Sequence, residues 1–198
     1  DGTDLGPVRD VIDIAGADLK EVAALNDARV AADFSRSGQR LFARVAGFPV
    51  PVVAAMHGAC AGGGFERALA CHWRIATDAA TTRIGLPEIG LGTIPGWGGG
   101  ARLARLIGSS AALAHLLQAR LLPASDAYRD GLVDELVAPA ELRARARAAA
   151  LEFAASGGAV RSRPPDALPA EFAELRAHTL ARTRGRVPAA SRRSISRS

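Results

Sequence analysis

The segment His57-Gly58-Ala59-Cys60-Ala61-Gly62-Gly63-Gly64-Phe65-Glu66 decides the architecture that the sequence predicts. An apolar run at residues 50–56 precedes it and a helical pattern at residues 65–71 follows it, which indicates a turn between a strand and a helix. Three consecutive glycines let the backbone turn sharply and let a ligand approach main-chain N–H groups. At the start of a helix such groups lack intrahelical partners and carry the positive end of the helix dipole. The segment therefore favours a place that holds developing negative charge, with Glu66 beside it. The alternative is a plain turn with a solvated glutamate.

Short strands and helices alternate on both sides of this turn. The predicted helices are residues 26–46, 65–71, 101–107, 109–118, 125–129, 139–155 and 171–183. The first helix is expected to be amphipathic, with Phe34, Leu41, Phe42 and Val45 on the apolar face that packs on the core. Ser109 or Ser110 is the expected N-cap of the fourth helix. The predicted strands or extended pieces are residues 51–56, 72–76, 121–122 and 132–137, whereas residues 78–83 and 84–92 are expected to be a turn and a loop. This alternation predicts an α/β fold with a largely parallel sheet.

Composition and charge restrict the class of protein. The 198 residues carry a net charge of +5, but residues 161–198 contain nine arginines against three acidic residues, so residues 1–160 are close to neutral. We expect a core domain at residues 1–160, followed by a basic helix and a disordered tail at residues 161–198. Nucleic-acid binding through that tail is a weak alternative, because the tail lacks interleaved aromatic residues.

Compartment and cysteine use follow from the same composition. No apolar run has the length of a membrane span, and the first residues show no signal-peptide pattern. Cys60 and Cys71 are expected to be small core residues without a disulfide framework, and the expected compartment is the cytoplasm.

Two glutamates next to glycine-rich turns are the candidate catalytic residues. Glu66 follows the glycine triplet, and Glu88 follows Pro87 in a loop punctuated by glycine and proline. Two carboxylates in one cleft allow one to take a proton while the other gives one. A small-residue turn at residues 15–18 could bring another free N–H group close to the first, and two such groups form an oxyanion hole. The sequence shows no spacing typical of metal ligands.

Three segments together resemble the enoyl-CoA hydratase/isomerase (crotonase) family: residues 15–19, residues 59–66 and residues 84–99. They occur in the order of the family, and the resemblance runs from about residue 14 to about residue 155. The segment at residues 126–133 is similar to a late helix–strand junction of the family. The sequence around residues 71–72 and at residues 81–97 is similar to the hydratase portion of multifunctional fatty-acid oxidation enzymes.

The resemblance implies a crotonase-like ββα spiral with a C-terminal helical region. It also implies self-association, based on trimers or within a multifunctional complex. The implied activity is hydration of a trans-2-enoyl-CoA to a 3-hydroxyacyl-CoA in fatty-acid β-oxidation. The CoA thioester is the substrate, and neither a cofactor nor a metal is expected. Two alternatives stay open: a Δ3-Δ2-enoyl-CoA isomerase, and a non-catalytic, truncated remnant that binds acyl-CoA.

The resemblance also assigns roles to individual residues. Glu66 and Glu88 would be catalytic and would hold and activate water. Ala17 and Gly63 would supply the two N–H groups of the oxyanion hole. The residues expected to contact the substrate are Ala15, Asp18, Leu19, Gly62, Pro87 and Gly96. Histidines 57 and 72 are expected to be packed or hydrogen-bonded rather than catalytic, and the two tryptophans, Trp73 and Trp97, are expected in the core or at its rim.

Two departures from the family pattern bear on this expectation. Only fourteen residues precede Ala15, where family members usually have several dozen that form the first strands of the core. The fold is therefore expected to be incomplete at its N-terminal side, with exposed strand edges. Arg67 follows Glu66, at a position where the family usually has an apolar residue.

Overall fold

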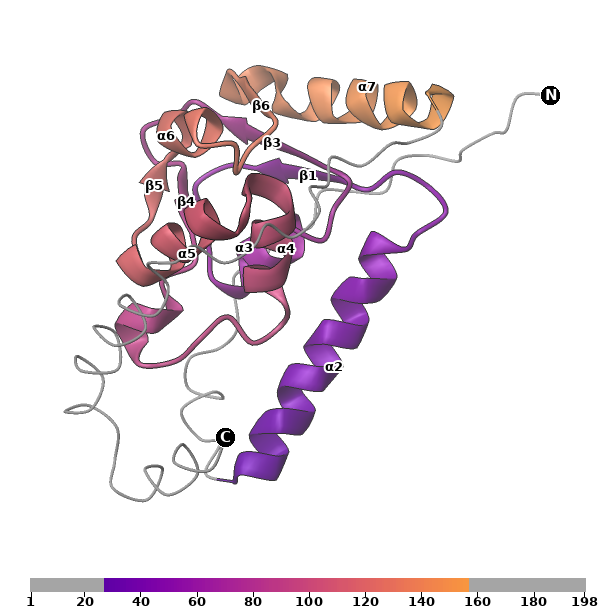
Figure 1. Ribbon diagram of the computed structural model, residues 1–198. Helices are drawn as coiled ribbons and strands as arrows, with labels where there is room; N and C mark the ends of the chain where they lie inside the picture. Colours follow the sequence, from indigo (N-terminus) through magenta and orange to yellow (C-terminus); the bar gives the residue numbers. More distant parts are fainter. Residues whose placement is uncertain (1–26, 157–198) are drawn as a thin grey trace.

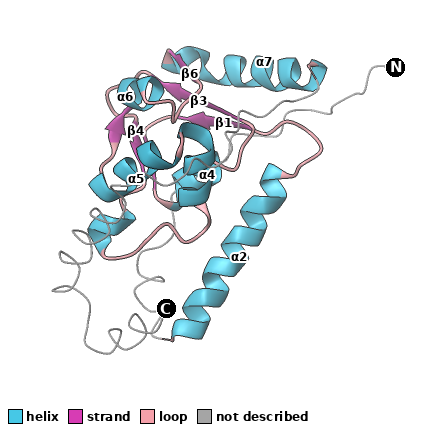
Figure 2. Ribbon diagram, in the orientation of Figure 1, coloured by secondary structure: helices cyan, strands magenta, loops and turns pink. Residues whose placement is uncertain are grey.

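The computed structural model describes residues 27–156, and Figure 1 shows their arrangement. Several predictions lie outside these residues. They are the small-residue turn at residues 15–18, the helix at residues 171–183 and the disordered basic tail. Within the described part, helices and short strands alternate along the chain as predicted (Figure 2).

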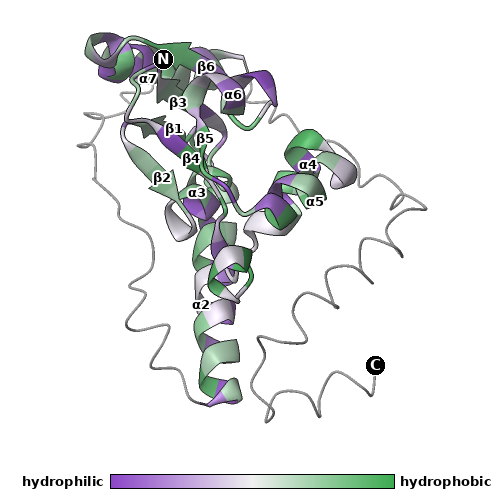
Figure 3. Cartoon of the chain, turned by 90° about the vertical axis from the view of Figure 1, so that its left-hand side faces the viewer, coloured by the Kyte–Doolittle hydropathy of each residue, from purple (hydrophilic) through white to green (hydrophobic). Residues whose placement is uncertain are grey.

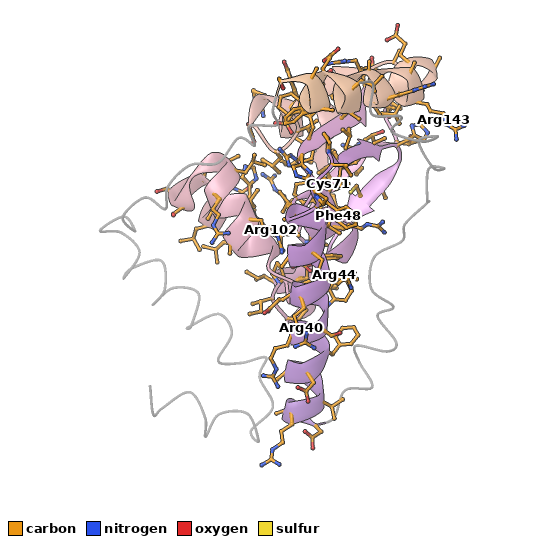
Figure 4. The ribbon with its side chains drawn as sticks, turned by 90° about the vertical axis from the view of Figure 1, so that its right-hand side faces the viewer. Arg40, Arg44, Phe48, Cys71, Arg102 and Arg143 are labelled. Atoms are coloured by element: carbon orange, nitrogen blue, oxygen red, sulfur yellow. The ribbon has the colours of Figure 1, made fainter. Side chains whose placement is uncertain are left out.

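The first described element is the long helix α2 (Ala28–Ala46). Asp27 caps it, because its side chain accepts hydrogen bonds from the main-chain N–H groups of residues 29 and 30. Phe42 is buried, as the apolar face predicts. Leu41 is 54% exposed, so the prediction that Leu41 lies on the packed face is wrong. Neighbouring residues of a helix are about 100° apart, and Leu41 points away from the face that contains Phe42. Arg40 and Arg44 extend from the same helix (Figure 4), and one end of α2 projects away from the strands (Figures 1 and 3).

Two small sheets form the centre of the molecule. The first has the order β1 (Val53–Met56), β3 (Trp73–Thr77), β6 (Glu135–Val137), with all strands parallel. The second has the order β2 (Ala59–Ala61), β4 (Arg83–Gly85), β5 (Leu122–Pro123), where β2 and β4 are parallel and β5 is antiparallel. The predicted strands at residues 51–56, 72–76 and 132–137 are confirmed within a few residues, and the largely parallel pairing is confirmed.

The loop predicted at residues 84–92 is wrong in part. Its first residues belong to β4, and residues Glu88–Leu91 form the 3₁₀ helix η1. The strand was not predicted because residue 85 is glycine, which is rare inside strands. The structure gives the reason for the glycine: a Cβ atom there would lie 2.4 Å from the carbonyl oxygen of Arg120. Gly85 therefore lets the backbone of a neighbouring segment approach the strand closely.

Short helices cover the two sheets. They are α3 (Gly63–Ala68), α4 (Gly99–Ile107), α5 (Ser109–Gln118), α6 (Ala124–Arg129), η2 (Pro139–Glu141) and α7 (Leu142–Ala155). Helix α3 begins two residues earlier and ends three residues earlier than predicted. Helix α5 starts after Gly108, and no side chain caps it, so neither serine is its N-cap. Gly108 has φ +92°, which glycine adopts readily.

The core lies between the two sheets and helices α3 to α6. Its fully buried large side chains include Phe65, Ile84, Leu103 and Leu132. Helix α7 lies along the first sheet (Figure 1), where Phe153 contacts the ring of Trp73. Arg74 of β3 and Asp134 form a buried ion pair, which fixes the segment before β6 to that sheet. This frame places the turn between β2 and α3 at the centre of the molecule.

Candidate active site

The turn between β2 and α3 has the geometry that the glycine triplet predicts. Gly62 is the N-cap of α3 and has φ +55°, in the region that favours glycine. Its N–H group donates to the carbonyl oxygen of Gly85 at 3.0 Å, which fixes the turn to the end of β4. Because β2 and β4 are parallel neighbours, the segment that follows β4 lies beside the start of α3. Pro87 and Glu88 belong to that segment.

Glu66 lies in the first turn of α3 and is only 2% exposed. Its Oε1 atom accepts hydrogen bonds from the main-chain N–H groups of Trp97 and Gly99, both at 2.8 Å. A Cβ atom at position 99 would lie 2.5 Å from Cγ of Glu66, so only glycine fits beside this carboxyl group. The glycine cluster at residues 96–100 therefore orients Glu66 through main-chain contacts.

Several opposing effects act on the pKa of Glu66. Burial raises it, because a buried carboxylate loses the hydration that it has in water. The two main-chain donors and the nearby Arg102 guanidinium act in the opposite direction, and burial prevails. A carboxyl group with a raised pKa is better able to carry a proton near neutral pH, as acid–base catalysis requires.

Glu88 begins η1 and completes a carboxylate pair with Glu66. A Cβ atom on Gly62 would lie 3.1 Å from Oε1 of Glu88, which places this carboxyl group against the first glycine of the turn. Burial raises the pKa of Glu88, and the negative charge of Glu66 raises it further. The Oε2 atom of Glu88 is buried and has no hydrogen-bond partner among residues 27–156. A buried oxygen of this kind points to a polar ligand, such as a water molecule.

The indole of Trp97 forms one wall of this site, which sequence reasoning missed. Cζ3 of the ring lies 2.4 Å from the position of a Cβ atom on Gly63. The indole also contacts α2, where it packs between Phe34 and Phe42 with ring centroids 5.5 Å from each. The one available signal was its place inside the glycine cluster at residues 96–100, and that signal does not tell a core tryptophan from one at the site.

Arg102 supports the loop that carries Trp97. Its Nη1 atom donates to the carbonyl oxygen of Trp97 at 2.7 Å, and its guanidinium lies 6.0 Å from the centre of the Phe42 ring. Figure 4 shows Arg102 at α4, on the side where that helix lies near α2. The arginine thus joins α4, the Trp97 loop and α2.

Comparison with known proteins identifies this arrangement. A model of the enoyl-CoA hydratase/isomerase family matches residues 9–182. The chain belongs to this family. Among solved structures, the chain is similar to an enoyl-CoA hydratase of Geobacillus kaustophilus HTA426, with 37% identity over 71% of this chain and a TM-score of 0.66. An enoyl-CoA hydratase of Bacillus anthracis is 38% identical over 71% of this chain, with a TM-score of 0.64. An enoyl-CoA hydratase/carnitine racemase of Magnetospirillum magneticum is 28% identical over 88%, also with a TM-score of 0.64.

The enoyl-CoA hydratase/isomerase chain described here spans about half the length of these structures. The match covers 52%, 53% and 60% of the three, respectively. The expected crotonase-like fold is confirmed by the family match and by these TM-scores. In the part of the chain that the structure describes, no helix has the length and apolar character to cross a membrane.

The remaining predicted site residues of this family member fall into two groups. Pro87 directly precedes Glu88 as the N-cap of η1, and Gly96 contacts α2, where its carbonyl oxygen accepts from Nε2 of Gln39 at 2.8 Å. The second group lies outside the described residues: Ala15, Ala17, Asp18 and Leu19. The roles assigned to both groups stay predictions.

The histidines and cysteines of the described residues have structural contacts. Nδ1 of His57 lies 2.9 Å from the Thr77 hydroxyl, and Nδ1 of His72 accepts from the N–H group of Val52. Cys71 is buried and Cys60 half-buried, and both are free thiols, as predicted.

Proposed function

We propose that this chain is an enoyl-CoA hydratase that adds water to a trans-2-enoyl-CoA and forms a 3-hydroxyacyl-CoA. The observation that carries the proposal is the convergence of Glu66 and Glu88 on the turn before α3. Both are poorly hydrated, and Glu88 has a buried oxygen without a protein partner among the described residues. The CoA thioester is the substrate, and the proposal includes neither a cofactor nor a metal.

The two carboxyl groups divide the proton transfers of this reaction. One carboxylate takes a proton from water while the water oxygen forms its bond to C3 of the enoyl group. The π electrons of the C2=C3 bond move toward the thioester carbonyl, and the other carboxyl group then gives a proton to C2. Each group ends in the state from which the other began, and proton exchange with solvent restores the pair.

Main-chain N–H groups stabilise the negative charge that develops on the thioester oxygen. Gly63, the first residue of α3, would donate one hydrogen bond, and Ala17 would donate the second. Fixed donors of this kind stabilise an enolate without reorganising during the reaction, and the loss of one typically costs about 100- to 1,000-fold in rate.

Hydration of crotonyl-CoA by the purified chain tests the proposal, followed as the loss of the conjugated thioester absorbance. We expect Glu66→Gln and Glu88→Gln each to lower kcat by at least about 100-fold. Glu141→Gln, at an exposed glutamate of η2, is the matched control and should match the unaltered chain.

Two other outcomes would replace the hydratase proposal. Loss of activity in only one of the two glutamine variants, with conversion of a 3-enoyl-CoA to the 2-enoyl isomer, would favour a Δ3-Δ2-enoyl-CoA isomerase. Binding of acyl-CoA by a cooperatively folded chain without turnover would favour a non-catalytic, acyl-CoA-binding remnant.

The setting of the activity is also part of the proposal. We propose that the reaction belongs to fatty-acid β-oxidation and takes place in the cytoplasm. A trimer-based assembly or membership of a multifunctional complex is the proposed state. Size-exclusion chromatography with light scattering would measure the molecular mass of the assembly. The mass of a single chain would contradict the proposed trimer.

A further inference from the structure

The indole of Trp97 lies in the gap between the first turn of α3 and helix α2. Its six-membered ring reaches Gly63, where a Cβ atom would lie 2.4 Å from Cζ3. Its five-membered ring reaches Gly38 of α2, where a Cβ atom would lie 2.1 Å from Cδ1. Any side chain at position 38 or 63 would collide with the ring in this position. Two glycines on separate helices therefore provide the space that the indole occupies.

The surroundings of Trp97 hold this ring in place. Phe34 and Phe42 of α2 pack on it, and the ring of Phe42 meets it nearly edge-on at 87°. The main chain of Trp97 is fixed as well, since its N–H group donates to Glu66 and its carbonyl oxygen accepts from Arg102. The ring is therefore held in one position beside the catalytic carboxyl group. A mobile side chain in the gap could move aside for a ligand, and this one is restrained from doing so.

We propose that Trp97 determines substrate specificity by limiting the acyl group to short chains, an inference that rests on the proposed hydratase function. A thioester whose oxygen is bound by the N–H group of Gly63 has its acyl carbons next to the indole. An acyl chain that extends from there toward α2 meets the face or edge of the ring within a few carbons. A short acyl group packs against the indole, whereas a long one has to displace it or bend away.

The test compares kcat/KM for crotonyl-CoA and trans-2-decenoyl-CoA in the full chain and in three variants. Trp97→Ala opens the gap and should raise the decenoyl-to-crotonyl ratio by at least about tenfold, because several additional methylenes gain apolar contact. Trp97→Phe keeps an aromatic ring between Phe34 and Phe42 but shortens it, so a smaller rise in the same direction is expected. If Trp97→Ala does not fold, Trp97→Phe alone still tests the inference.

Trp73→Phe is the matched control, because Trp73 packs on Phe153 of α7 and donates to Glu135, away from the carboxylate pair. The decenoyl-to-crotonyl ratio of this variant should equal that of the unaltered chain. An unchanged ratio in both folded Trp97 variants would overturn the inference and leave the hydratase proposal intact.

Binding gives a second readout that does not depend on turnover. The chain has two tryptophans, so Trp97 is the only one left in Trp73→Phe, and its fluorescence reports on the site. Butanoyl-CoA, which cannot be hydrated, should alter this emission, and decanoyl-CoA should bind more weakly. Binding with no preference for the shorter chain would overturn the inference even in an inactive protein. An absence of any acyl-CoA binding would overturn the inference and the proposed function together.

Discussion

Gly99 lies directly against the side chain of Glu66, so close that a Cβ atom would sit 2.5 Å from Cγ and 2.9 Å from Oε1 of the glutamate. The N–H group of the same glycine donates to Oε1. The hydrogen bond depends on this close contact, because the N–H group of residue 99 reaches the buried carboxyl group only when residue 99 has no side chain.

Gly99→Ala should therefore displace Glu66 and disable the site. The expected result is a fall in kcat of about 100-fold or more, since a displacement of about 1 Å can cost that much. Overpacking should also lower the free energy of unfolding by about 1–3 kcal/mol. Gly100→Ala is the matched control, because a Cβ atom there meets Leu116 at an ordinary 3.5 Å. Full activity in Gly99→Ala would show that Glu66 does not depend on this contact.

Gly62→Ala tests the place of Glu88 relative to the turn. The substitution adds a side chain at φ +55° and a Cβ atom 3.1 Å from Oε1 of Glu88. We expect a destabilisation of about 1–3 kcal/mol from the backbone and a loss of activity from the displaced carboxyl group. Gly58→Ala separates the two effects, because Gly58 also has positive φ but has open space around its Cβ position. Equal activities of the two variants would contradict the assigned contact.

The pH dependence of stability follows from the raised pKa of Glu88. Because its pKa is raised on folding, chiefly by burial and further by Glu66, the folded state binds a proton more readily than the unfolded state. The ionised carboxylate therefore lowers stability as pH rises from 4.5, its ordinary pKa, through the raised value. Glu88→Gln should melt at a higher temperature than the unaltered chain at pH 8. This difference should shrink as pH falls toward 4.5, as thermal denaturation at several pH values would measure. A constant difference across this range would show that the charge of Glu88 is not its cause.

The buried ion pair of Arg74 and Asp134 makes a prediction about folding rather than catalysis. The two side chains are 2% and 0% exposed, so removal of Asp134 leaves a buried charge without its main partner. Asp134→Ala should lower the free energy of unfolding by about 3–5 kcal/mol in denaturant titrations. Asp33→Ala, which breaks an exposed pair with Arg36, should cost no more than about 1 kcal/mol. Similar losses in the two variants would contradict the assigned role of burial.

Local sequence signals predicted the turn and the helix around the glycine triplet, and the structure has them with shifted ends. The strand predicted at residues 51–56 is β1, but the short strand β2, which leads directly into the turn, was missed. Local signals also predicted that Glu66 and Glu88 belong to one site, because both follow glycine-rich breaks and match motifs of one family. These local signals could not predict that the side chain of Trp97 lies at the site. The partners of its indole, Gly38 and Gly63, are far away in sequence, and only the tertiary arrangement of α2 and α3 on either side of the ring brings them together. Strand β4 was missed for a related reason, because the close approach of Arg120 that explains Gly85 is a tertiary contact.

The hydrogen bonds that hold Glu66 come from the peptide backbone at positions 97 and 99, not from side chains. Replacement of the side chain at position 97 leaves its amide donor in the chain. Selection can therefore alter the residue that contacts the acyl group while the orientation of the glutamate is inherited unchanged. A change of residue at position 97 can therefore alter which acyl groups are accepted without altering the orientation of Glu66. A series of natural or engineered residues at this position could vary the substrate range while the catalytic geometry is kept.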